Sequence, residues 1–520
     1  SGPVARGREH SRRGNRKGCA GALPGKGTPM AEKTKKKKEP ISSFSILLIL
    51  LVVLAVISWI AAAATGGTVT AASLSNILTS PIYGFTGAPS DIVEGAANPD
   101  TFPGGALEVC FFVMILGGFL GVMTKTGALD NGIAVLVKKL KGNELVLIPI
   151  LMILFSIGGT TYGMCEETVP FYVLLAATMY AAGFDAMVGS AVVLLGAGCG
   201  VLGSTVNPFA VGAAVSSLVD AGIQVNQGII IALGAILWIS TTAVSIIYVM
   251  KYAAKVKKDR GSTILSLQEQ EAEKENFGKD NALEDVTLTG RQKGALIVFA
   301  IAFIVMVISF IPWEDFGVEI FLGWSAVITG LPLGEWYFVE AACWFFILAL
   351  IIAVVGGLSE AETVKAFIDG TADMMSVVMI IALARGISIL MAETGMSDWI
   401  LLNASNALQG VSAFIFAPAS WLLYVVLSFL IPSSSGMATV SMPIMGPLAA
   451  NLGFSVETMV MIFSSANGFV NLFTPTCGAI MGGLAVAHVQ YGTWLKWVGK
   501  LLAILAVICL VIVTVAMCIL

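Results

Sequence analysis

Two adjacent glutamates lie in an otherwise uncharged stretch of this sequence. Acidic residues in such a stretch bind or carry ions more often than they make a surface soluble. Glu166 and Glu167 lie in 158–168, GGTTYGMCEET, between two short apolar arms. An ionisable group at membrane depth is costly and indicates function by default. The pair could face a cationic ligand, carry a proton or help to bind sodium. Alternatively, the segment lies near the membrane surface and water solvates both carboxylates.

One arginine also stands in apolar surroundings. Arg385 lies in 379–390, MIIALARGISIL, and is the one Lys or Arg in the apolar parts of the second half. Its guanidinium could bind a carboxylate through two parallel hydrogen bonds. It could equally pair with a buried acid or extend to the membrane interface. Asp398, which follows a Thr-Gly turn, is interpreted as the N-cap of an interfacial helix.

Polar residues with Gly or Pro interrupt the apolar sequence at 158–168, 198–208, 432–439 and 467–475. Unwound backbone at membrane depth is tolerated only where it is buried in protein or lines a watery cavity. There it exposes N–H groups that suit anions and C=O groups that suit cations. Hydroxyls that bond back to their own helix, and simple proline kinks, are the alternative. Four such segments favour a ligand site, and its candidate residues are Thr160, Thr161, Glu166, Glu167, Ser204, Asn207, Arg385, Ser433, Ser434, Ser435, Asn467, Asn471 and Thr474.

The interruptions belong to an internal repeat, a feature worth seeking before any other. Four landmarks recur in the same order in both halves. They are 123–130 with 391–398, 163–170 with 436–443, Gly183-Phe184 with Gly453-Phe454, and the prolines Pro208 and Pro475 that close the later breaks.

The composition is that of a membrane protein. Hydrophobic residues make up 57% of the 520 and charged residues 12%, and the mean hydropathy is +0.89. A soluble chain of this length needs far more charge. No basic face for nucleic acid is present, and eight scattered cysteines with two histidines do not predict a metal site.

The lysines predict the orientation of the helices through the positive-inside rule. The cluster at 33–38 places the N-terminus in the cytoplasm, and the charged segment 251–293 is a cytoplasmic linker with a solvated, Glu-rich helix. The segments 65–105 and 312–336 carry acids only and are predicted to be external, as is the C-terminus. The run 106–123 then points inward, and its counterpart 374–391 points outward.

The predicted fold is therefore an all-α polytopic membrane protein with two inverted repeats, each with a re-entrant hairpin and a broken transmembrane helix. We divide the chain into a basic tail (1–43), a first repeat (44–250), the linker (251–293), scaffold helices (294–373) and a second repeat (374–520). Within the tail, Met30 is interpreted as the native start and 1–29 as an added or disordered segment.

The two segments 158–171 and 194–209 resemble the YfcC branch of the DcuC-like carriers, within the ion-transporter superfamily. The resemblance covers roughly residues 44 to 520, and its most specific parts are the Glu-Glu pair and the Ser-Thr-x-Asn-Pro element. It implies a scaffold domain with a transport domain that moves as an elevator, a homodimer, and the bacterial inner membrane with its lipids. Members of the family include C4-dicarboxylate carriers and arginine/ornithine exchangers.

The charges favour one of these substrates. Two glutamates suit the cationic end of a basic amino acid, and Arg385 suits its carboxylate, so we expect a basic amino-acid antiporter. A sodium- or proton-coupled carboxylate transporter is the alternative, because a coupling cation would neutralise the acids. No cofactor is expected beyond such a sodium ion or proton. The sequence shows no nucleophile–base pair or cofactor loop that would indicate an enzyme.

Overall fold

The computed structural model describes residues 43–96, 99, 102–139, 143–220, 222–278, 287–311, 313–431 and 433–520. The interpretation of Met30 and of the basic tail thus lies outside the described residues, as does Pro432. All regular elements in the described ranges are helical. Nine helices of the described chain are long and apolar enough to cross a membrane. The prediction of an all-α polytopic membrane protein is confirmed.

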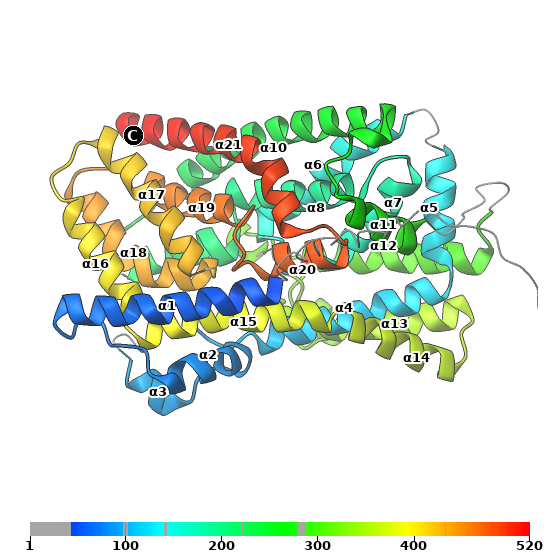
Figure 1. Cartoon of the computed structure of the whole chain (residues 1–520), viewed down its shortest axis with the longest axis horizontal. Coiled ribbons are helices and arrows are strands. Elements are labelled where there is room, and N and C mark those ends of the chain that lie inside the picture. Colours follow the sequence, from blue (N-terminus) through cyan, green and yellow to red (C-terminus); the bar gives the residue numbers. More distant parts are fainter. Residues whose placement is uncertain are drawn as a thin grey trace, which may run out of the picture. The chain divides into compact units, whose positions relative to one another are not determined.

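The helices form two series of similar order (Figure 1). The first series is α1 (Ser43–Thr65), α2 (Leu74–Thr86), α3 (Ser90–Glu94), α4 (Leu107–Lys125), α5 (Ala128–Lys139), α6 (Leu147–Tyr162), α7 (Val169–Ala181), α8 (Ala186–Leu202), α9 (Ala213–Asp220) and α10 (Gln227–Lys258). After α11 (Leu267–Phe277) and α12 (Gly290–Phe310) come α13 (Phe338–Gly356), α14 (Glu360–Asp373), α15 (Met375–Glu393), α16 (Met396–Ala407), α17 (Ala413–Leu430), α18 (Ser434–Asn451), α19 (Val456–Val470), α20 (Gly478–Val486) and α21 (Tyr491–Ile519).

The two series repeat the same pairings of helices. Helices α6 and α7 pack on α8 as α17 and α18 pack on α19, and α2 packs on α15 as α14 packs on α4. The long helices α10 and α21 lie side by side (Figure 1). Helices α13 and α14, in the segment 294–373 that was predicted to be scaffold, pack against α4. The inverted relation of the halves and the domain boundaries stay predictions.

The glycine landmarks of the repeat share one backbone conformation. Gly127 and Gly395 have φ of 67° and 68°, and Gly183 and Gly453 have φ of 90° and 74°. This left-handed region favours glycine because it has no Cβ. The matched pair at 163–170 and 436–443 differs, because Gly163 ends α6 whereas the corresponding glycine lies inside α18. The two hairpin tips therefore have different structures.

The predicted external segment contains a helix that packs deep against the second half. Helix α2 crosses α15 where a Cβ on Gly84 would lie 2.3 Å from the carbonyl oxygen of Ala382 and from the amide nitrogen of Gly386. Backbones can approach this closely only where the side chain is absent. The contact fixes the stretch of α15 that carries Arg385.

The linker helix α11 is not solvated on all sides, which corrects the sequence interpretation. Glu273 accepts a hydrogen bond from the backbone N–H of Ala186, 2.6 Å away, where α8 begins. Glu269 accepts one from the backbone N–H of Gln490, 2.8 Å away, where α21 begins. Both side chains are buried. Carboxylates satisfy unpaired N–H groups and favour the positive end of a helix dipole, so α11 ties the two halves together.

This arrangement makes the docking of α11 dependent on pH. Burial and the nearby Asp185 raise the pKa of Glu273 to about 7, against opposing contributions from the hydrogen bond donated by Ala186 and from the charge of Arg260. The neighbouring Asp185, held by Tyr252 and Thr263, also has its pKa raised by burial. A docked Glu273 with a raised pKa binds a proton that the undocked side chain has lost, so docking weakens as pH rises through about 7.

We predict that amide hydrogen exchange of 267–277, corrected for its intrinsic pH dependence, becomes faster as pH rises from about 5 to about 8. The loss of docking free energy should be about 1 to 3 kcal/mol. The variant Glu273→Gln keeps a hydrogen-bond acceptor for Ala186 without a titrating group, so its exchange should show little of this dependence. Equal pH dependence in the two proteins would contradict the assignment.

Candidate functional site

The first hairpin tip joins α6 to α7 and contains both glutamates. Glu167 is buried, and its carboxylate accepts a hydrogen bond from the backbone N–H of Cys165, 3.0 Å away. The short 3-10 helix Glu166–Thr168 precedes α7, which begins at Val169. Glu167 is thus part of the tip's own structure, whereas Glu166 is only partly buried.

The first hairpin is bound to the break that ends α8. The hydroxyl of Thr160 donates to the carbonyl of Gly203 over 2.7 Å, and the backbone N–H of Thr205 donates to the carbonyl of Thr160 over 2.9 Å. Asn207 accepts from the N–H groups of the next helical turn and donates to Ser204 over 3.0 Å. Thr160, Ser204 and Asn207 thus lie at the same break, and their role in ligand binding stays a prediction.

Thr161 has a different role from Thr160. Its hydroxyl bonds back to the carbonyl of Ile157, 2.6 Å away in the same helix. This is the alternative that the sequence analysis left open for hydroxyls at such positions. Thr161 therefore does not join the network at the break.

The second hairpin makes an equivalent network with the break after α19. Ser434 donates to the side-chain oxygen of Asn467 over 2.7 Å, and Asn471 donates to the same oxygen over 3.3 Å. The buried Oδ1 atom of Asn471 has no hydrogen-bond partner among the described residues. Thr474 bonds instead with Thr476, 2.7 Å away between their hydroxyls.

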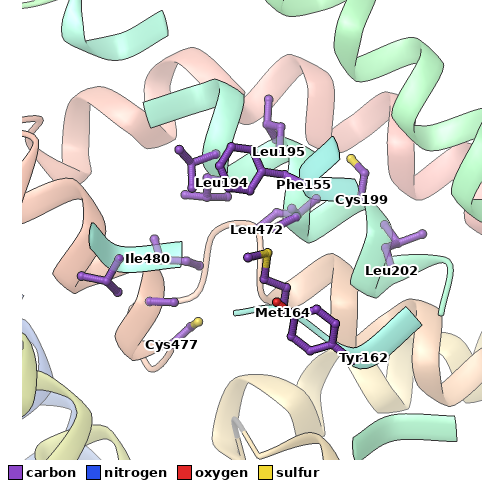
Figure 2. Close-up of a cluster of buried hydrophobic side chains, with 14 of the residues drawn as sticks. Phe155, Tyr162, Met164, Leu194, Leu195, Cys199, Leu202, Leu472, Cys477 and Ile480 are labelled. Carbon is purple, nitrogen blue, oxygen red and sulfur yellow. The ribbon is translucent and has the colours of Figure 1, made fainter. Parts of the chain in front are cut away.

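The two breaks lie against each other. A Cβ on Gly468 would lie 2.4 Å from Cα of Leu202, so α19 crosses α8 at the residues just before both breaks. Figure 2 shows Leu472 of the second break in one buried cluster with Tyr162 and Met164 of the first hairpin. The residues predicted from both halves therefore converge on one region.

A cavity of ≈ 310 Å³, here called the Arg385 cavity, opens beside this region. Helix α15 contributes Arg385 and Ser388, α16 contributes Asp398, and the second tip contributes Ser433 and Ser435. Of the described residues that line it, Arg385 is the one cation and Asp398 the one anion. The cavity can accommodate a small polar molecule with at least one negative group.

Three residues of the cavity were missed or misassigned from sequence. Ser388 lies three residues after Arg385, a spacing that places both on one helix face. Asp398 is not an N-cap, because Gly395 takes that position in α16 and leaves Asp398 in the first turn. Thr439 follows Ser435 by four residues, so both lie on the same face of α18, and Thr439 also lines the cavity.

Glu166 and Arg385 approach each other from the first tip and from α15. Each acts on the other electrostatically, and Cys110 of α4 lies within reach of both charges. The ion pairs between described residues are Lys257 with Glu144 and Lys365 with Asp369, and neither includes Arg385. Arg385 therefore belongs to no ion pair of the described residues, and Glu166 is the acid that acts on its charge.

A second cavity, of ≈ 1090 Å³, lies near the other end of α15. Lys125, Lys365 and His488 line it, together with Phe277 of the linker helix. Met374 and Ser376 at the start of α15 border this cavity, whereas Ser388 and Ala392 near its end border the Arg385 cavity. Helix α15 thus borders two cavities, and charged side chains contribute to the lining of each.

Comparisons with known proteins add the following. The family model described as DcuC, C4-dicarboxylate anaerobic carrier, matches residues 41–518. An uncharacterized protein of Haemophilus influenzae is 32% identical over 404 residues, which cover 78% of this chain and 74% of that protein. The Escherichia coli protein named "Putative basic amino acid antiporter YfcC" is 30% identical over 431 residues, which cover 81% of this chain and 79% of that protein.

Two solved structures are also similar to this chain. The YdaH transporter of Alcanivorax borkumensis is 15% identical with a TM-score of 0.45, and the match covers 90% of this chain and 98% of that one. MtrF of Neisseria gonorrhoeae is 16% identical with a TM-score of 0.41, and the match covers 93% of this chain and 96% of that one.

The contrast between two adjacent threonines gives a test of the first network. Thr160→Val removes the hydroxyl that satisfies the Gly203 carbonyl, so we predict a loss of about 1 to 3 kcal/mol in the free energy of unfolding. Thr161→Val is the matched control and should change it little, because Thr161 bonds only within α6. Thermal unfolding of the purified variants measures the loss of stability in each. Equal losses in the two variants would show that the break does not depend on Thr160.

Proposed function

The chain belongs to the DcuC family of C4-dicarboxylate anaerobic carriers, and we propose that within this family of membrane transporters it is a basic amino-acid antiporter. The proposal depends on Arg385. This residue lines a cavity of small-molecule size, and it belongs to no ion pair of the described residues. Such a guanidinium binds a carboxylate through paired, charge-assisted hydrogen bonds. The family assignment makes the chain a transporter and not an enzyme.

Acidic groups beside Arg385 support a cationic substrate. Glu166 acts electrostatically on Arg385 from the first tip and is not fully buried. A basic amino acid would place its carboxylate on Arg385 and its cationic side chain toward Glu166. Glu167 contributes to the negative charge of the tip but is held by the backbone of Cys165. The name of the Escherichia coli relative agrees with this substrate class.

The cavities and breaks support alternating access. The Arg385 cavity and the second cavity border α15 from its two ends, so a bound molecule could be exposed to each side in turn. The hairpins and broken helices of both halves form one packed unit through α8 and α19. We propose that this unit moves as an elevator against a scaffold, within a homodimer in the bacterial inner membrane, with the N-terminus cytoplasmic and the C-terminus external.

A sodium- or proton-coupled carboxylate transporter is the second candidate, which the family description favours. The carbonyl of Gly203 and the hydroxyls of Thr160 and Thr205 bring together oxygen atoms, which are the ligands of hard cations. A dicarboxylate, however, needs a second cation, and the described lining of the Arg385 cavity holds one.

The direct test is exchange across a membrane. We predict that proteoliposomes loaded with ornithine take up labelled arginine and that empty vesicles do not. Arg385→Lys keeps the charge but loses the paired geometry, so uptake should fall at least about tenfold. Glu166→Gln should reduce uptake of arginine, whereas Glu360→Gln, at an exposed acid of α14, serves as the control.

Two results would contradict the proposal. The first is the absence of arginine uptake by ornithine-loaded vesicles that contain folded protein. The second is uptake of a dicarboxylate that ceases when the sodium or proton gradient is dissipated, which would favour the second candidate.

A further inference from the structure

We propose that the Arg385 cavity binds the zwitterionic head of an α-amino acid, with Arg385 on the carboxylate and Asp398 on the α-ammonium group. This inference rests on the proposed function and specifies how that site selects its substrate. Asp398 reaches the cavity from a different helix than Arg385.

The turn between α15 and α16 brings the two charges to one cavity. Gly395 has a φ of 68° and reverses the chain after α15, so the first turn of α16 faces the helix that carries Arg385. Asp398 is partly buried, and it is absent from the ion pairs of the described residues. An acid and a base that line one cavity of ≈ 310 Å³ complement a ligand that carries both a carboxylate and an ammonium group.

Ser388 is the second, independent observation. Its side chain is 1% exposed, lines the cavity, and its hydroxyl has no hydrogen-bond partner among the described residues. Buried hydroxyls without a partner are rare in folded proteins and require an explanation. Ser388 follows Arg385 by one helical turn, so a carboxylate bound to the guanidinium can also accept from this hydroxyl.

Two other hydroxyls of the cavity already have partners. Ser433 accepts from the backbone N–H of Gly436 over 3.2 Å, and Thr439 donates to the carbonyl of Ser435 over 2.9 Å. They can shape the cavity without being left unsatisfied when it holds no ligand. Among the described lining residues, Ser388 has the buried hydroxyl without a partner, so a ligand would satisfy it together with the two charged side chains.

The charges predict which molecules are rejected. A dicarboxylate would place its second carboxylate near Asp398, and like charges repel most strongly where water is excluded. An amine without a carboxylate would leave Arg385 and Ser388 unsatisfied. Glu166 is not among the residues that line this cavity, so it is not part of the site inferred for the zwitterionic head.

The test compares three ligands on the full-length purified protein by calorimetric titration. They are arginine, the same molecule without its α-amino group, and the same molecule without its α-carboxylate. We expect removal of either group to weaken binding at least about tenfold, because each leaves a charged partner unsatisfied. In Asp398→Asn, arginine and the molecule without the amino group should bind with similar affinity. Asp91→Asn, the same change at an exposed aspartate of α3, should keep the wild-type preference.

Three results would overturn the inference. They are a wild-type protein that binds the molecule without the amino group as tightly as arginine, an Asp398→Asn variant that keeps the full preference, and a Ser388→Ala variant that binds arginine with unchanged affinity. If Asp398→Asn does not fold, the first comparison decides alone. Binding of a neutral α-amino acid through Asp398, without any basic one, would contradict the proposed function and support this inference. If arginine–ornithine exchange occurs but Asp398→Asn leaves the ligand preference unchanged, the proposed function is supported and this inference is contradicted.

Discussion

The structure depends on one constraint, which is that backbone polar groups interrupted at membrane depth must find partners within the protein. Helices α8 and α19 both end in a break, and a hairpin packs beside each helix. At the first break, Thr160 of the hairpin donates to the carbonyl of Gly203. At the second, Tyr491 and Trp494 of α21 donate to the carbonyls of Phe473 and Leu472. The contacts of both breaks with neighbouring elements meet this requirement.

The two halves share landmarks but divide the chemistry unequally. Asp185 and Ser455 cap α8 and α19 at matched positions after left-handed glycines. The first tip then supplies two carboxylates, one of which is used by its own backbone. The second tip supplies hydroxyls that line the Arg385 cavity. A substrate with chemically distinct ends suits such a site better than a symmetric one.

Much of this arrangement could be predicted from the sequence, because apolar runs, Gly-Pro interruptions and isolated charges are local signals. These signals identified the breaks, the hairpins and Arg385. Asp398 and Ser388 were not identified as cavity residues, because only the turn at Gly395 brings α16 back toward α15. The burial of Glu269 was missed for a related reason. A Glu-rich helix is predicted to be solvated, because the sequence does not show that unpaired N–H groups of neighbouring helices bind its carboxylates.

The central claim is that Arg385 holds the carboxylate of an amino-acid substrate, and ligand-dependent thermal stabilisation tests it most directly. A ligand that binds only the folded protein raises its melting temperature by mass action. The account predicts that arginine or ornithine stabilises the protein with or without sodium, and that Arg385→Lys loses this stabilisation. Stabilisation by a dicarboxylate with sodium, and by no amino acid, would contradict it and assign the acidic tip to a coupling cation.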